Sequence, residues 1–140
     1  MKVREVMTNS VDCATPNTTL VELAKMMKNN DVGSIPICEE QKVVGIVTDR
    51  DIVLEAVAKG KNIETQKATE IMRSKVITVT ANQDVHEAAS LMSKYQIRRL
   101  PVVEQGRLIG IVALGDLAVE NIHVNEAGDA LSDISQGAHH

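Results

Sequence analysis

The sequence predicts an α/β (α+β) fold of two β-α-β-β-α repeats, related by a pseudo-two-fold axis, with their sheets packed together and the helices outside. Three observations lead to this prediction. Val, Ile and Leu make up 39 of the 140 residues, which is enough to bury a core. Tyr95 is the only aromatic residue, so the core is aliphatic, and its β-branched residues favour strands. The third observation is an internal repeat.

The chain matches itself at an offset of 65 residues. Between Glu5 and Glu55, 15 of 51 positions carry the same residue as the position 65 further on, and no gap is needed. A duplication explains this match. We expect repeat 1 at residues 1–60, a linker at 61–67, repeat 2 at 68–124 and a flexible C-terminal tail at 125–140. Each repeat alone is marginal in size, so the two should pack face to face and form two equivalent clefts where they meet.

The same order of elements is expected in both repeats. A short strand comes first, at Val11–Thr15 and at Val76–Thr80, and a turn follows it. A helix comes next, with Thr19 and Asp84 as N-caps and a Glu three residues later at the spacing of a capping box. Two hairpin strands and a second helix complete each repeat. In chain order, these strands and helix starts are Ile35–Cys38, Val43–Val47 and Asp49 in repeat 1, and Leu100–Val103, Leu108–Val112 and Leu114 in repeat 2.

The charge distribution argues against nucleic-acid and membrane partners. The net charge is −2 over residues 1–66, +3 over 67–112 and −5 over 113–140, with no long basic stripe. Single-stranded bases stack on several aromatic rings, and this chain has only Tyr95. No run of 18 apolar residues is present, and charges at Arg4 and Glu5 stand where a signal peptide would be apolar. We expect a cytoplasmic protein.

The sequence contains no pattern typical of catalysis or of a metal site. Cys13 and Cys38 are 25 residues apart, which matches no zinc spacing, and we expect two reduced, buried thiols. His86 lies on the expected first helix of repeat 2, where it is interpreted as a helix-surface residue. No Ser/His/Asp or Cys/His grouping and no phosphate-binding glycine-rich loop is present. The protein is therefore predicted not to be an enzyme and to hold no metal.

Motifs in both repeats resemble those of the CBS domain, the repeat named after cystathionine β-synthase. In repeat 1 these are Val-Met-Thr at 6–8, Val-Gly-Ser-Ile-Pro-Ile at 32–37 and Gly-Ile-Val-Thr-Asp-Arg-Asp at 45–51; repeat 2 has counterparts at 97–103 and 110–116. The resemblance covers about residues 1–122 and implies a stand-alone CBS pair. Such pairs bind AMP, ADP, ATP, S-adenosylmethionine or cyclic dinucleotides in the clefts between repeats. They need no obligatory cofactor and commonly form homodimers.

The family motif Gly-h-h-Thr/Ser-x-x-Asp, in which h is apolar, assigns roles to Thr48 and Asp51. The resemblance implies that Asp51 holds the ribose hydroxyls and that Thr48 reaches the phosphate. The residues agree with this, because a helix start with free N–H groups is a natural phosphate site. The alternative is that Thr48 only caps the helix and Asp51 complements its dipole. Repeat 2 keeps Asp116 but has Ala113 in place of the hydroxyl, so its cleft should bind more weakly, bind another ligand or be vestigial.

Arginines and apolar residues complete the predicted ligand-binding set. Arg98 is expected to reach the Asp51 cleft and Arg50 the Asp116 cleft, while Arg99 should point to the opposite strand face from Arg98. The alternative for these arginines is ordinary solvent exposure. The adenine would lie against apolar walls, for which core packing is the alternative. The candidate wall residues are Val11, Cys13, Ile35, Pro36, Val76, Thr78, Leu100 and Pro101.

The predicted function is therefore a non-catalytic regulatory module that binds an adenosine-containing nucleotide and acts on a regulated partner protein. Its mechanism would be conformational, because a ligand that bridges both repeats shifts the equilibrium between states. The alternative is a ligand-free oligomerisation or interaction scaffold, or a nucleic-acid-responsive or metal-responsive CBS protein. Ligand-dependent thermal stabilisation separates these functions.

Overall fold

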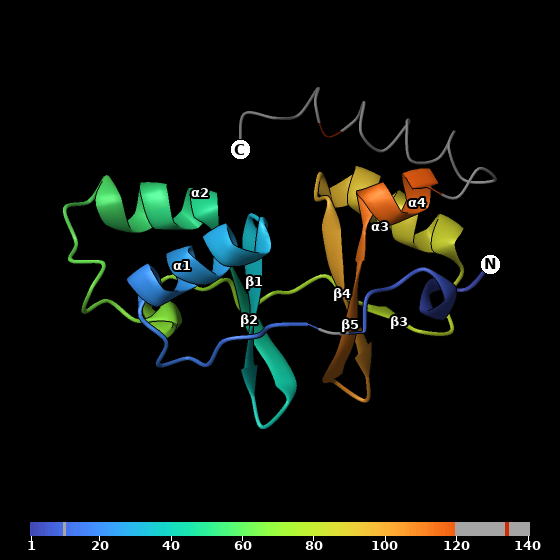
Figure 1. Ribbon diagram of the computed structural model, residues 1–140, viewed down its shortest axis with the longest axis horizontal. Coiled ribbons are helices and arrows are strands. Elements are labelled where there is room, and N and C mark those ends of the chain that lie inside the picture. The colour runs from blue at the N-terminus through green and yellow to red at the C-terminus, as the bar shows by residue number, and fades with distance from the viewer. Residues whose placement is uncertain (10, 120–133, 135–140) are drawn as a thin grey trace. The chain divides into compact units, whose positions relative to one another are not determined.

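The structure is a computed structural model that describes residues 1–9, 11–119 and 134, and the chain forms two compact units (Figure 1). One unit is Asp12–Val76; the other combines the first eleven residues with the chain from Ile77 onwards. The predicted tail at 125–140 lies outside the described residues except for Ile134, which is buried in the core of the second unit. The mixed α+β fold class is confirmed.

In the unit Asp12–Val76, an antiparallel hairpin lies beside two helices (Figure 1). The hairpin strands are β1 (Ser34–Glu39) and β2 (Lys42–Thr48). A single parallel bridge joins Ala14 to β1, and a single antiparallel bridge joins Arg73 to Ile46 of β2. The helices are α1 (Leu20–Asn30) and α2 (Asp49–Ile52), and α2 continues as the π-helical turn η2 (Val53–Val57).

The other unit repeats this order. Strand β3 (Val79–Thr80) is parallel to β4 (Arg99–Glu104), which forms an antiparallel hairpin with β5 (Arg107–Ala113). Thr8 bridges Ile111 of β5, as Arg73 bridges Ile46 in the first unit. The helices are α3 (Val85–Tyr95) and α4 (Leu114–Val119). Two short 3₁₀ helices precede the bridging segments: η1 (Val3–Glu5) before Thr8 and η3 (Ala68–Glu70) before Arg73.

A glycine in each hairpin allows this bridging segment to lie close against the strand. A Cβ on Gly45 would lie 2.7 Å from Met72 Sδ and 3.1 Å from the carbonyl oxygen of Arg73. A Cβ on Gly110 would lie 2.8 Å from the carbonyl oxygen of Thr8. Real Cβ atoms essentially never make contacts below 3.0 Å, so the neighbouring atoms would have to shift. The glycine of the Gly-h-h-Thr/Ser-x-x-Asp motif therefore determines where Arg73 and Thr8 lie.

The hairpins, the helix starts and the Thr19 cap follow the sequence prediction. Thr19 accepts from the Glu22 N–H and Glu22 bonds back to the Thr19 N–H, both at 3.3 Å. The prediction of a second capping box at Asp84 was wrong. Asp84 caps α3 by accepting from His86 N at 2.9 Å, and the Glu87 carboxylate accepts from Gln83 Nε2 instead.

The first predicted strand of each repeat is much shorter than expected. Val11–Thr15 contributes the single bridge at Ala14, and Val76–Thr80 contributes only Val79–Thr80. Each unit has a separate aliphatic core beneath its hairpin. The most deeply buried side chains include Leu20, Leu23, Ile35, Ile37 and Val47 in one core, and Val3, Met92, Leu100, Val102 and Val112 in the other.

Candidate ligand-binding site

Thr48 and Asp51 close the junction between β2 and α2. Thr48 is the last residue of β2 and the N-cap of α2. Its backbone is still extended, and its side chain accepts a hydrogen bond from the first helical turn. The Asp51 N–H donates to Thr48 Oγ1 at 3.0 Å, and the Thr48 N–H donates to Asp51 Oδ2 at 3.1 Å. Asp51 is 4% exposed. The reciprocal bonds hold a buried carboxylate in a single orientation.

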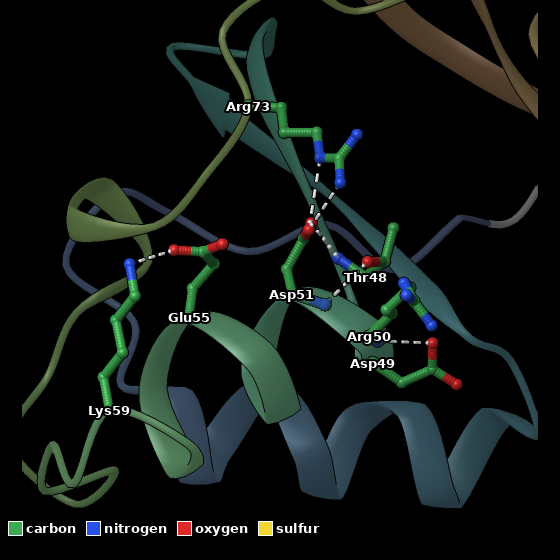
Figure 2. A network of polar contacts seen from close by, with 7 residues as sticks. All are labelled: Thr48, Asp49, Arg50, Asp51, Glu55, Lys59 and Arg73. Atoms are coloured by element: carbon green, nitrogen blue, oxygen red, sulfur yellow. Dashed lines mark hydrogen bonds and ion pairs between the residues drawn. The ribbon is translucent and has the colours of Figure 1, made fainter. Parts of the chain in front are cut away.

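Arg73 supplies the positive charge that compensates this buried carboxylate. Its Nε and Nη2 atoms donate to Asp51 Oδ1 at 3.1 and 2.9 Å (Figure 2). Its side chain is 66% exposed, whereas that of Asp51 is 5% exposed. The sequence reasoning missed Arg73. Its repeat counterpart is Thr8 of the Val-Met-Thr motif, so the repeat comparison did not indicate an arginine at this place.

In the other unit the equivalent carboxylate, that of Asp116, has different neighbours. The Ala113 N–H donates to Asp116 Oδ2 at 2.9 Å, as Thr48 N does to Asp51, but Ala113 has no hydroxyl to return a bond. Thr8 stands in the position of Arg73. Arg99 of β4 is opposite Ala113. Burial lowers the pKa of the Arg99 guanidinium, and the negative charge of Asp116 offsets part of this effect. Each carboxylate therefore has an arginine near it, which is Arg73 of the bridging segment for Asp51 and Arg99 of β4 for Asp116.

Two other predicted arginines lie on the first turn of α2 and just before β4. Arg50 is an exposed residue of α2, and its backbone N–H donates to Asp49 Oδ1 at 2.8 Å (Figure 2). Arg98 is exposed just before β4, and its carbonyl accepts from the Leu114 N–H at 2.8 Å. Its counterpart Gly33 bonds in the same way to the Asp49 N–H. The phosphate-binding roles of Arg50, Arg98 and Arg99 stay predictions.

The predicted adenine-wall residues are divided between the two units. Cys13, Ile35, Pro36 and Val76 belong to one unit, and Val11, Thr78, Leu100 and Pro101 to the other. Ile35 and Leu100 are core residues, at 2% and 0% exposure, so core packing accounts for their burial. Pro36 and Pro101 are also buried, while Val11, Val76 and Thr78 are half-buried.

The expectation that both cysteine thiols are buried was wrong for one of them. Cys38 is buried, but Cys13 is exposed, and both are free. The Cys38 N–H donates to the carbonyl of Ala14 at 2.8 Å, which places the two cysteines on neighbouring chain segments. Burial, together with the charge and hydrogen bond of the Cys13 thiol, raises the pKa of Cys38 to about 12. Within residues 1–9, 11–119 and 134, no three His, Cys, Asp or Glu side chains are grouped so as to hold a metal ion.

Comparison with known proteins gives one family for both repeats. The family model of the CBS domain matches residues 3–58 and 68–121. The CBS domain-containing protein YhcV of Bacillus subtilis is 43% identical over 133 residues, which are 95% of this chain and 94% of that protein. No helix in the described part of the chain has the length and apolarity needed to cross a membrane.

Two solved structures are similar in fold and sequence. Hypoxic Response Protein I, crystallised with two coordinated zinc ions, has a TM-score of 0.76 and 36% identity, with 85% of this chain and 98% of that chain covered. The CBS domain pair of protein MJ0100, in complex with 5′-methylthioadenosine and S-adenosyl-L-methionine, has a TM-score of 0.75 and 32% identity, with 85% of this chain and 94% of that chain covered.

Proposed function

The chain belongs to the CBS-domain family, and from this premise we propose that it is a non-catalytic regulatory module that binds adenosine-containing ligands. CBS pairs are regulatory modules. The observation that carries the proposal is the carboxylate at the start of the second helix in each repeat, which is buried for Asp51 and half-buried for Asp116. Asp51 and Asp116 both accept the N–H of the residue three positions earlier, and Asp51 also accepts two bonds from Arg73, so both carboxylates serve as acceptors at a helix start.

The chemistry of repeat 1 suits an adenosine monophosphate. A carboxylate accepts hydrogen bonds from the two vicinal hydroxyls of a ribose. Thr48 Oγ1 accepts the Asp51 N–H, so its own O–H remains able to donate to a phosphate oxygen. The MJ0100 pair in complex with 5′-methylthioadenosine and S-adenosyl-L-methionine supports an adenosine-type ligand by similarity. We therefore propose Asp51 as the ribose-binding residue and Thr48 as a phosphate-binding residue.

Isothermal titration of the full chain with AMP, ADP, ATP and S-adenosylmethionine tests this function. We expect heat of binding from at least one of them, which Asp51→Ala removes at the repeat 1 site. Asp116→Ala should cost less, because Ala113 supplies no hydroxyl in repeat 2. A folded protein that gives no heat with any of the four compounds would contradict the proposed function.

A ligand-free oligomerisation scaffold is the second candidate, and one observation favours it. Val53, Leu54 and Val57 of the α2–η2 helix are large apolar side chains exposed on the surface. Their spacing places them on one side of the helix, while Ile52 and Ala56 are buried. We propose that this apolar face mediates self-association, as the predicted homodimer requires. The two candidates differ in one measurement, since a scaffold without a ligand shows no thermal shift with nucleotide.

The remaining predicted properties stay proposals. The cytoplasmic location and the regulated partner protein rest on the sequence. The metal-responsive alternative has a zinc-bound relative, Hypoxic Response Protein I, but no cluster of ligands among the described residues of this chain favours it.

A further inference from the structure

We propose that Arg73 is a specificity residue that moves from Asp51 to the ligand, so that the repeat 1 site selects adenosine ligands carrying an anionic group. This inference rests on the proposed function, because it takes Asp51 as the ribose-binding residue. It goes beyond that function by naming the step that binding requires and the chemical class that this step favours.

Asp51 has too few open acceptor sites for a ribose while Arg73 is bound. A carboxylate offers about four lone-pair sites, two on each oxygen. Arg73 Nε and Nη2 both donate to Oδ1, and the Thr48 N–H donates to Oδ2. One site remains open to donors, whereas the two vicinal hydroxyls of a ribose require two. Ribose binding to Asp51 must therefore displace at least one of the bonds from Arg73.

Arg73 is the movable partner of this pair. Asp51 is fixed by its reciprocal bonds with Thr48 and is buried, whereas the Arg73 side chain is 66% exposed. The Arg73 backbone is held separately, because its N–H donates to the carbonyl of Ile46 at 2.9 Å and its carbonyl accepts from the Ile46 N–H at 3.0 Å. The guanidinium can therefore change partners without any change in the bridge to β2.

A displaced guanidinium needs a new anion, and this requirement determines the ligand class. Three of the five N–H groups of Arg73 take no part in the pair with Asp51. A guanidinium binds a phosphate with parallel hydrogen bonds, as it binds a carboxylate. An anionic ligand thus replaces the bonds that Arg73 gives up, while an uncharged nucleoside does not. The ion pair therefore disfavours adenosine and tolerates AMP.

Titration of the full chain with adenosine and with AMP tests the inference, with Arg73→Gln as the main variant. Wild-type protein should prefer AMP by about tenfold or more. Arg73→Gln should weaken AMP binding about tenfold and tighten adenosine binding several-fold, because Asp51 Oδ1 then accepts ribose hydroxyls without losing a partner. Lys75→Gln is the matched control, since it removes the same charge from an exposed position two residues away. It should leave both affinities near their wild-type values.

The opposite signs for the two ligands separate this proposal from a structural role of Arg73. Arg73→Lys, which keeps the charge with a single nitrogen, should give intermediate values for both ligands and is the variant to use if Arg73→Gln does not fold. Equal changes for adenosine and AMP, or a Lys75→Gln variant that behaves like Arg73→Gln, would overturn this inference and leave the proposed function standing. Absence of binding by the wild-type protein would overturn both.

Discussion

Thr48 and Asp51 bond to each other in both directions at the start of α2, and the second repeat makes only half of this exchange. The Thr48 hydroxyl accepts the Asp51 N–H at 3.0 Å and the Asp51 carboxylate accepts the Thr48 N–H at 3.1 Å. At the start of α4, Asp116 accepts the Ala113 N–H at 2.9 Å, and Ala113 has no side-chain acceptor. The start of α4 therefore lacks the one hydroxyl group that completes this exchange at the start of α2.

Thr48→Ala should lower the free energy of unfolding by about 1 kcal/mol, because it removes an N-cap acceptor from a half-buried helix start. The reverse change, Ala113→Thr, adds the missing acceptor in repeat 2 and should stabilise the protein by a smaller amount. Urea denaturation followed by far-UV circular dichroism measures both changes. A Thr48→Ala variant as stable as the wild type would contradict the capping role of this hydroxyl.

Gly45→Ala should destabilise the protein and weaken nucleotide binding at the Asp51 site. The added Cβ would lie 2.7 Å from Met72 Sδ and 3.1 Å from the carbonyl oxygen of Arg73, so the segment that carries Arg73 has to shift. Gly115→Ala is the control, because a Cβ there meets no heavy atom within 4 Å in the described part of the chain and alanine favours a helix. Thermal unfolding with and without AMP measures both effects. Equal behaviour of the two variants would show that the close contact at Gly45 is unimportant.

The sequence predicts the local part of the fold and misses the part that depends on distant chain segments. The hairpins and the Thr19 cap follow from alternation and from residues three apart, which one short window contains. Residues of Val11–Thr15 have strand composition, but a strand needs a partner along its whole length, and only Ala14 finds one, at Ile37. The bridge of Thr8 to Ile111 joins residues from opposite ends of the chain, and no periodicity indicates such a pair.

The residues of the candidate site also separate into those that a short stretch of sequence indicates and those that depend on distant segments. Thr48 and Asp51 are three residues apart and carry the family motif, so the sequence indicated both. Arg73 is 22 residues from Asp51, and its repeat counterpart is Thr8, so neither spacing nor repeat identity marks it as a partner of the carboxylate. The burial of Cys38 and the exposure of Cys13 also depend on packing, which similar apolar surroundings in the sequence did not distinguish.

The two cysteines should differ sharply in reactivity. Iodoacetamide at mildly alkaline pH should add one group to the native protein, at the exposed Cys13, and two groups after unfolding in urea. Intact-mass spectrometry counts the groups, and Cys13→Ala should reduce the native count to zero. Two groups on the native protein would contradict the burial of Cys38.

The raised pKa of Cys38 also predicts an alkaline loss of stability. The folded thiol has a pKa of about 12, against an ordinary value of 9.0, so the folded state holds this proton more tightly than the unfolded state. The contribution to stability is complete below about pH 9 and is lost as the pH rises from about 9 towards about 12. Urea midpoints across this range measure the loss, and Cys38→Ala should reduce the slope. An unchanged slope would assign the pH dependence to other groups.

The apolar face of the α2–η2 helix should control self-association. Val53 and Val57 are four residues apart, 54% and 55% exposed, and removal of such surfaces from water is favourable. Replacement of both by lysine places two like charges at a contact between copies, so we expect the molar mass from size-exclusion chromatography with light scattering to fall to that of a monomer. Tyr95→Lys is the matched control, because it changes an exposed large residue on a different helix. A doubly substituted protein that keeps the wild-type molar mass would place the contact between copies elsewhere, and a Tyr95→Lys monomer would do the same.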